Sequence, residues 1–321
     1  MSFSLRNIKR LESGIKISMP PDENGLTGRE CPKADCLGYF KVKFGTGLKG
    51  ENLPCHCPYC GHTSGHDHFW TQEQLEYARS IMMNEVSKAL KEDVKDWDRS
   101  LRQSTRNSFI KLSMEFKGGS HPIHYYREKQ LETHVICDAC TLEYAIYGVF
   151  AFCPDCGIHN SLQILDKNLE LVKKEIKLAQ DSDDMELAKH LIDDGLENAV
   201  SAFDGFGRAT CSTFASKAID LKQAKEISFQ NIDNARKRVQ TLFGFDLAFR
   251  ADQGDWDFII RCFQKRHLLA HTMGVVDDEY IKKTHDPQAI VGRKIRITPD
   301  EITRLIELLK IIGNNLFDNL Q

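Results

Sequence analysis

Cys137-Asp-Ala-Cys140 and Cys153-Pro-Asp-Cys156-Gly157 flank an aromatic stretch, residues 144–152, and this arrangement decides how the middle of the chain folds. Two cysteine pairs on tight turns, separated by a strand, can present four sulfur atoms about 2.3 Å from one zinc ion. The spacing predicts a zinc module over residues 119–161. Four cysteine ligands leave no coordination position open, so we expect the zinc to be structural rather than catalytic.

A second cysteine cluster lies nearer the start of the chain. Cys31 and Cys36 precede an alternating strand, and a glycine-rich turn then leads to Cys57 and Cys60. These four cysteines are the predicted ligands of another structural zinc ion, in a module covering residues 1–70. The sequence leaves open whether a neighbouring donor replaces one of them, the candidates being Cys55, His56 and His62. Both segments resemble the zinc-ribbon family, in which the metal stabilises a core too small to hold itself together.

Composition limits the remaining possibilities. Nine of the eleven cysteines lie between Cys31 and Cys156, and residues 1–16 lack a secretory apolar core, so metal binding is favoured over disulfides. Cys211 and Cys262 stand apart and are expected to be buried apolar residues. The formal net charge is −3, and no apolar run approaches the ~20 residues of a membrane helix. We therefore expect a cytoplasmic protein, in which any nucleic acid would meet a local basic patch.

A long charged helical segment, residues 71–118, is predicted between the two ribbons. Thr71 and Gln74 fit a capping box, and apolar residues then recur at helical spacing to about Glu115. Its charges favour a solvated helix face. The alternative is a track for a nucleic-acid backbone, formed together with lysines of the first ribbon. The basic residues concerned are Arg99, Arg102, Arg106, Lys111, Lys41, Lys43 and Lys49.

Helical periodicity takes over after the second ribbon. A charged helix within residues 162–184 is interpreted as a linker, and residues 185–321 predict an antiparallel all-α bundle. The fold class is therefore α+β, mostly α, with two small zinc ribbons joined by a long helix and followed by a helical bundle. The predicted bundle helices are one from Met185 closed by Gly205 and Gly207, a second over about 213–243, a third over 255–270, and a last one starting at the capping box Thr298-Pro-Asp-Glu301.

Arg266-His-Leu-Leu-Ala-His271 ends the third bundle helix and places a permanent cation and two imidazoles within six residues. This stretch matches the pattern of arginine, polar residue, three residues and histidine that marks the HEPN superfamily. The downstream residues Gly274-Val-Val-Asp277, Tyr280 and Gly292 and the final helix are also similar to HEPN domains of prokaryotic defence and toxin systems. The resemblance covers residues 185–321. His267 stands where asparagine is most common, which leaves the role of its side chain open.

The HEPN resemblance implies metal-independent RNA cleavage, and the residues fit that chemistry. His271 can take the proton of a ribose 2′-hydroxyl or protonate the leaving 5′-oxygen, while Arg266 can bind the phosphate as its negative charge grows. Five helical residues turn through about 140°, so Arg266 and His271 do not share one face. One protomer would then hold half a site, and the HEPN resemblance implies a homodimer in which the two motifs face each other. The resulting hypothesis is an endoribonuclease, a toxin or anti-phage effector, whose ribbons recognise nucleic acid or a regulatory protein.

Two less specific interpretations compete with this one. Arg266 and the two histidines could simply complement the helix macrodipole at a C-terminus. The chain would then be a non-catalytic zinc-ribbon protein that binds nucleic acid and dimerises through an inactive HEPN domain. Asp277 and Tyr280 are interpreted as capping and packing residues rather than catalytic ones. The sequence leaves open the RNA specificity, the activating trigger and any restraining partner.

Overall fold

The structure is a computed structural model that describes residues 4–50, 53–107, 109–119 and 121–321. Residues 1–3, 51–52, 108 and 120, which fall within the predicted ribbons and connecting segment, lie outside the described residues. The chain divides into two compact units. The sheet unit contains residues 1–148 and 152–157, and the helical unit contains residues 149–151 and 158–321.

One antiparallel sheet joins both predicted ribbons. The strands β1 (Thr27–Glu30) and β2 (Tyr39–Val42) come from the first ribbon, and β5 (Thr133–Ile136) and β6 (Glu143–Ile146) come from the second. Their order is β1-β2-β6-β5, and β2 pairs with β6. The separate modules predicted over 1–70 and 119–161 are therefore parts of a single sheet unit. A hairpin of β3 (Pro54–His56) and β4 (Thr63–Gly65), followed by the turn η1 (His66–Phe69), completes this unit.

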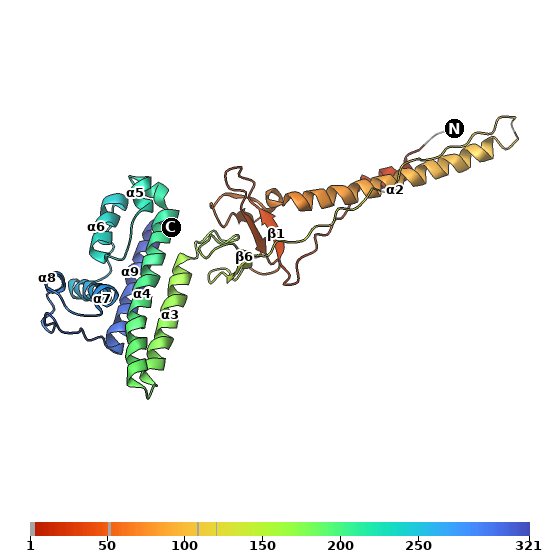
Figure 1. Cartoon of the computed structure of the whole chain (residues 1–321). Coiled ribbons are helices and arrows are strands. Elements are labelled where there is room, and N and C mark those ends of the chain that lie inside the picture. Colours follow the sequence, from red (N-terminus) through yellow and green to blue (C-terminus); the bar gives the residue numbers. More distant parts are fainter. Residues whose placement is uncertain (1–3, 51–52, 108, 120) are drawn as a thin grey trace. The chain divides into compact units, whose positions relative to one another are not determined.

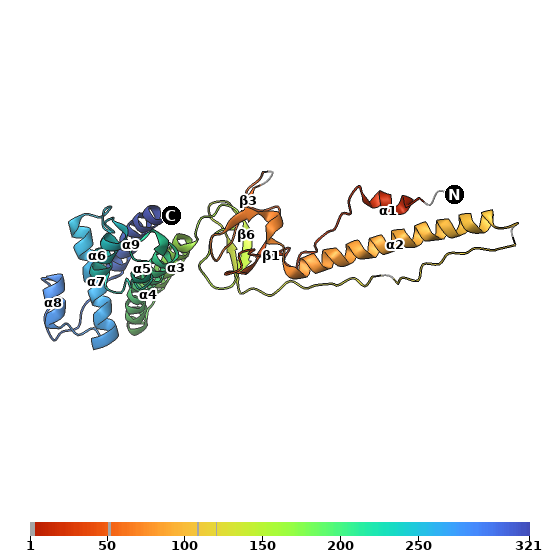
Figure 2. The ribbon, with the colours of Figure 1, turned by 90° about the horizontal axis from the view of Figure 1, so that it is seen from above.

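The long helix α2 spans Gln72–Ser104 and begins at the predicted capping box of Thr71 and Gln74. It ends before Glu115, where the sequence analysis places its end. Ser104 and Thr105 both donate their hydroxyls to the carbonyl of Leu101, which competes with a further helical turn. The chain then runs back along α2 (Figure 1 and Figure 2). The short helix α1 (Arg6–Leu11) is tied to α2 because Asp93 accepts hydrogen bonds from the backbone N–H groups at positions 7 and 8.

Three long helices form the centre of the helical unit. They are α3 (Ser161–Gln180), α4 (Met185–Thr213) and α9 (Pro299–Leu320), which lie side by side in Figure 1 and Figure 2. The predicted linker over 162–184 is instead largely α3, a full member of the bundle. Its apolar residues recur at spacings of four and three and form a buried stripe in the same core as α4 and α9. These residues are Leu165, Leu169, Val172 and Ile176.

The glycines of α4 were expected to close the helix, but the helix continues through both. A β-carbon on Gly207 would lie 2.5 Å from the ring of Phe229, so glycine here makes room for a buried aromatic side chain. The expected helix over 213–243 is broken into the turn η2 (Ala215–Lys217), α5 (Leu221–Lys225) and α6 (Ile232–Phe243). Side chains of Asp220 and Asn231 cap the last two helices, which gives each its own start.

The remaining elements carry the predicted motif. The helix α7 spans Gln253–Thr272 and confirms the helix expected over 255–270. A short helix, α8 (Asp278–Thr284), follows it, and α9 begins at the capping box of Thr298 and Glu301 as expected. None of the helices in the described residues combines the length and apolar character needed to cross a membrane.

Candidate functional site

Two groups of four cysteines in the sheet unit have the geometry of zinc sites. In the first, Sγ of Cys31 lies 3.7 Å from Sγ of Cys60, and Sγ of Cys36 lies 3.7 Å from Sγ of Cys57. A tetrahedron with Zn–S bonds of about 2.3 Å has sulfur atoms about 3.8 Å apart, whereas disulfide sulfurs are only about 2.05 Å apart. The four sulfurs therefore fit zinc and exclude a disulfide pairing.

The second group repeats this geometry. Sγ of Cys137 lies 3.7 Å from Sγ of Cys156, and Sγ of Cys140 lies 3.5 Å from Sγ of Cys153. Within each group all four sulfurs lie within 4.8 Å of one another. Both predicted ligand sets are confirmed, and the protein has two structural zinc sites, each built from four cysteines.

A common turn positions all four cysteine pairs. The residue that follows the second cysteine of every pair has a left-handed backbone, with φ angles of 46° at Leu37, 67° at Gly61, 63° at Thr141 and 71° at Gly157. In three of the turns the N–H of this residue donates to the carbonyl of the first cysteine. Glycine adopts this conformation without strain, whereas leucine and threonine do so at a cost. Metal binding explains why the backbone is held in this form at the non-glycine positions.

The spare donors near the first zinc site are not part of the four-sulfur group. Cys55 is fully buried, and His56 forms a hydrogen bond between Nδ1 and the Thr63 hydroxyl of 2.9 Å. The ring of His62 lies 6.3 Å from the ring of Phe69, centroid to centroid. The question that the sequence leaves open is therefore answered in favour of Cys31, Cys36, Cys57 and Cys60.

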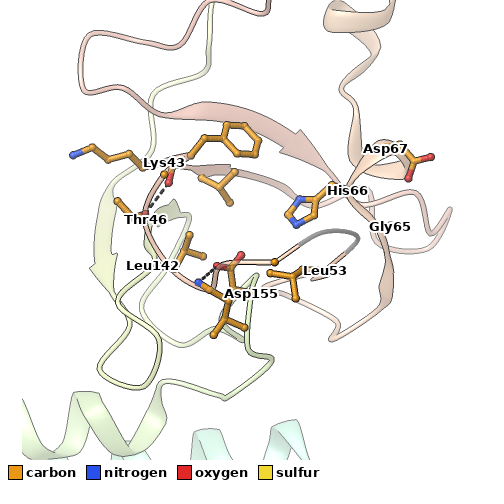
Figure 3. A pocket seen from close by; sticks show the side chains of 13 residues that line it. Lys43, Thr46, Leu53, Gly65, His66, Asp67, Leu142 and Asp155 are labelled. Carbon is orange, nitrogen blue, oxygen red and sulfur yellow. Dashed lines mark hydrogen bonds between the residues drawn. The ribbon is translucent and has the colours of Figure 1, made fainter.

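A cavity of about 530 Å³ lies beside the zinc sites, between β2, β4 and the loop that carries Asp155 (Figure 3). His66 points into it, and Nδ1 of His66 is buried without a hydrogen-bond partner among the described residues. Burial, reinforced by the nearby Arg29, lowers the pKa of His66, which favours a neutral imidazole. Phe44 lines the cavity and is 56% exposed. The cavity therefore offers an aromatic face and a neutral hydrogen-bonding group.

Most of the basic residues proposed as a nucleic-acid track are already paired. Lys41 is buried and lies 2.7 Å from Oδ2 of Asp22, so it is removed from the surface. Lys43 pairs with Glu143 at 2.7 Å, and on α2 the guanidinium groups of Arg99 and Arg102 pair with aspartates one turn earlier. These contacts favour the solvated-face interpretation of α2.

The predicted catalytic residues lie on the last two turns of α7. His267 and His271 are exposed and one helical turn apart, with ring centroids separated by 4.5 Å. Arg266 is half-buried. Because α7 is helical throughout this stretch, five residues turn through about 140°, and Arg266 does not share the face of His271. The helix therefore brings the two histidines together and directs the arginine elsewhere.

The end of α7 explains why His271 lies on its final turn. Met273 and Gly274 both have left-handed backbones, with φ angles of 53° and 79°. The N–H of Gly274 donates to the carbonyl of Leu268, and the hydroxyl of Thr272 donates to the same carbonyl, so the last turn is closed. A positive side chain at this end is also favoured by the helix macrodipole.

Arg266 has no charged partner in the described part of the chain. Its Nε is buried and has no hydrogen-bond partner in the described part of the chain, and no ion pair among those residues involves it. By contrast, the adjacent Lys265 is fully engaged, because its Nζ donates to the carbonyl of Arg296 and to Oε1 of Glu301, both at 2.7 Å. Lys265 thus holds the end of α7 against the start of α9, while the guanidinium of Arg266 forms no ion pair within the described residues.

The structure adds a basic loop that the sequence analysis does not single out. Val276 donates its N–H to the carbonyl of Arg293, and Val275 forms a β-bridge with Lys294, so the loop lies directly against the segment after the motif. Arg293, Lys294 and Arg296 are exposed, and within the described residues none forms an ion pair. The basic run Arg-Lys-Ile-Arg can be seen in the sequence. Its position next to the segment that follows the motif is evident only from the backbone pairing in the structure.

The two weaker candidates have the capping and packing roles expected of them. Asp277 caps α8 by accepting a hydrogen bond from the N–H of Tyr280. Tyr280 is buried, and its hydroxyl donates to Asp286 at 2.8 Å. Burial and this carboxylate raise the pKa of Tyr280, which keeps the phenol protonated. These contacts give Asp277 a capping role and Tyr280 a packing role.

These features define a protein with two four-cysteine zinc sites on one antiparallel sheet and a separate helical unit that ends one helix in Arg-His-x3-His. A comparison with protein-family models, curated proteins and solved structures found no match for this chain. The resemblance of the helical unit to HEPN domains therefore remains a prediction from the motif residues, and the activity that it implies is a proposal.

Proposed function

We propose that this protein is a metal-independent endoribonuclease of the HEPN type. The observation that carries the proposal is the contact between exposed His267 and His271 on a helix that also carries Arg266, an arginine without an ionic partner among the described residues. A surface histidine pair alone is common. The histidines are groups that can transfer protons, and Arg266 and the basic loop of Arg293, Lys294 and Arg296 add groups on the same unit that can bind phosphate.

RNA cleavage would proceed through the ribose 2′-hydroxyl. His271 removes the proton of that hydroxyl, whose oxygen attacks the adjacent phosphorus, while the bond from phosphorus to the 5′-oxygen breaks. A protonated histidine supplies a proton to the leaving 5′-oxygen. The products are a 2′,3′-cyclic phosphate and a 5′-hydroxyl. Arg266 stabilises the additional charge on the phosphate oxygens, and DNA is not cleaved because it has no 2′-hydroxyl.

A complete site requires two copies of the chain in this proposal. Arg266 and His271 diverge by about 140° around α7, so one protomer presents them in different directions. A homodimer through the helical unit would combine the histidines of one protomer with the arginine of the other. The zinc sites are structural and lie in the other unit, so they take no part in the chemistry.

The test is incubation of the full-length protein with a defined RNA in the presence of EDTA. Wild type should cleave it, and His271→Ala should lose at least about a hundredfold in rate, since general acid–base groups contribute about 10²–10⁴-fold. His190→Ala is the matched control, because His190 is an exposed helical histidine whose Nε2 lies 3.6 Å from Asp194. The His190 variant should cleave like wild type. In cells, toxicity should depend on His271 if the protein acts as a toxin or anti-phage effector.

A second candidate function is nucleic-acid binding by the sheet unit without catalysis. The observation that favours it is Phe44, whose ring is exposed beside the cavity and is backed by the buried guanidinium of Arg29 at 4.8 Å from the ring centroid. Such a ring can stack on a nucleobase. Phe44→Ala should then weaken RNA binding about tenfold, given about 1–3 kcal/mol per stacked base. If RNA is bound but His271→Ala changes nothing, this second function replaces the first.

A further inference from the structure

The segment after α2 has the sequence pattern of a strand but forms none in the structure. Apolar and polar residues alternate from Ile110 to Lys117, a period of two that is typical of strands. Among the described residues, positions 111–117 belong to no helix or strand, and no backbone–backbone hydrogen bond reaches them. Leu112 and Met114 remain 52% and 38% exposed. A strand pattern with exposed apolar side chains indicates that a partner is missing.

One hydrogen bond determines which edge of this segment faces outward. The backbone N–H of Met114 donates to Oδ1 of Asp98 on α2 at 2.9 Å, and the segment runs back along α2 in both views (Figure 1 and Figure 2). In extended backbone, successive N–H groups point to opposite edges. In the extended conformation of a strand, the N–H groups of Ser113 and Glu115 would therefore point away from α2. This outward edge carries the backbone groups that a second strand would need.

We propose that residues 110–116 pair antiparallel with the same segment of a second copy of this chain, with the two-fold axis at Ser113. This register places Lys111 of one copy opposite Glu115 of the other, twice by symmetry. Leu112 is then opposite Met114, and Ile110 is opposite Phe116. One face of the pair joins opposite charges and the other joins apolar side chains, both of which stabilise antiparallel strands.

Charge selects this register over its neighbours. A pair centred on Leu112 would place Lys111 opposite Ser113 and Glu115 opposite Phe109. A pair centred on Met114 would place Lys111 opposite Lys117, which brings like charges together. Centring on Ser113 also makes the outward backbone groups of the two strands meet as hydrogen-bonded pairs. The contact is formed by the sheet unit and is separate from the dimer that the proposed ribonuclease needs.

The first test is a disulfide trap in the full-length, zinc-loaded protein. Residues that face each other in a hydrogen-bonded antiparallel pair have Cα atoms about 5.5 Å apart, within the range that a disulfide spans. Ser113→Cys should therefore form a covalent dimer in a glutathione redox buffer. Lys117→Cys is the control, because the two copies of position 117 would lie about 27 Å apart along the strands. The unaltered protein measures crosslinking by the native cysteines.

The second test changes the register-defining charges in the Ser113→Cys background. Lys111→Glu should lower the crosslinked fraction at limiting protein concentration about tenfold, since it replaces two opposite-charge pairs by two like-charge pairs. Adding Glu115→Lys reverses both charges and should restore the crosslinked fraction. Equal crosslinking by Ser113→Cys and Lys117→Cys, or failure of the charge reversal to restore the dimer, would overturn the proposal. Dimerisation through the helical unit cannot produce this pattern.

Discussion

Removal of zinc should unfold the sheet unit and leave the helical unit folded. The sheet unit has little apolar core of its own, because its strands are three or four residues long and only six of the 33 residues of α2 are buried. By comparison, eleven of the 22 residues of α9 are buried in the helical unit. A structural zinc ion contributes about 10–16 kcal/mol of apparent binding free energy, whereas a whole domain is stable by about 5–15 kcal/mol. The free energy lost when zinc is removed should therefore exceed the unfolding free energy of the sheet unit.

The two zinc sites should also be coupled. β2 pairs with β6 through Lys41 with Ala145 and Val42 with Tyr144, so the ribbons share one sheet. A dye that binds released zinc should detect two ions per chain. Hydrogen exchange followed by mass spectrometry should show that a chelator removes protection from peptides covering residues 27–42 and 133–146. Peptides covering residues 302–317 should keep their protection, because they lie in the helical core.

Cys57→Ser and Cys55→Ser form a matched pair for this experiment. Both side chains are buried and two residues apart, but only Cys57 belongs to a four-sulfur group. Cys57→Ser should lose one zinc ion and weaken protection in β6 as well as β2, whereas Cys55→Ser should retain two. Equal zinc loss in both variants would refute the ligand assignment. Equal loss of protection in both units on chelation would refute the separate role of the metal in the sheet unit.

Three further predictions concern the helical unit. Gly207→Ala should lower the unfolding free energy of the helical unit by about 2 kcal/mol, because the new methyl group overpacks against a buried ring. Gly205→Ala, whose methyl group meets no atom within 4 Å, should raise this free energy by about 0.5–1 kcal/mol. Chemical denaturation compares the two variants. Lys265→Met should lower the unfolding free energy by on the order of 2 kcal/mol, because it leaves the partly buried Glu301 without its cation. Recovery in the double variant Lys265→Met, Glu301→Gln would support this reason, and an unchanged denaturation midpoint for the single variant would contradict it. Burial lowers the pKa of His159 to about 4. The free energy of unfolding should therefore be highest above the unfolded pKa near 6.5 and should fall by up to about 3 kcal/mol as the pH drops from 6.5 to 4. His159→Phe should flatten that part of the curve of unfolding temperature against pH, and an unaltered slope would contradict the prediction.

Local patterns predict the parts of this protein that depend on neighbouring residues in the chain. The close cysteine spacings identify both zinc sites, because a ligand pair needs only one tight turn. The capping boxes at Thr71 and Thr298 likewise mark the starts of α2 and α9. These features need no information about distant segments.

Other parts depend on contacts between distant residues and could not be read in this way. β2 and β6 are about 100 residues apart, and neither strand pattern indicates its partner. Gly207 looks like a helix end in sequence but provides space for Phe229, which lies elsewhere in the chain. The charges on α3 suggested a linker and concealed a regular buried stripe, which the spacing of its apolar residues could have revealed.

The candidate site shows the same division. The spacing of four residues between His267 and His271 predicts that they share a helix face, and the rings do lie together. The lack of an ion pair at Arg266 could not be predicted. It depends on which side chains the surrounding elements bring near the guanidinium, and among the described residues none of them is a paired carboxylate. The basic loop is held against the segment after the motif by backbone pairing between distant residues, including the bridge between Val275 and Lys294.

The most direct measurement is the chemical identity of the RNA ends left by the wild-type protein in EDTA, compared with His271→Ala and His190→Ala. The proposal predicts 2′,3′-cyclic phosphate and 5′-hydroxyl ends from the wild type and the His190 variant. The His271 variant, with its zinc content and hydrogen-exchange protection unchanged, should produce neither. Undiminished cleavage by His271→Ala, or intact RNA after incubation with folded, dimeric wild-type protein, would contradict the assignment of His271 as the proton-transfer group of a ribonuclease.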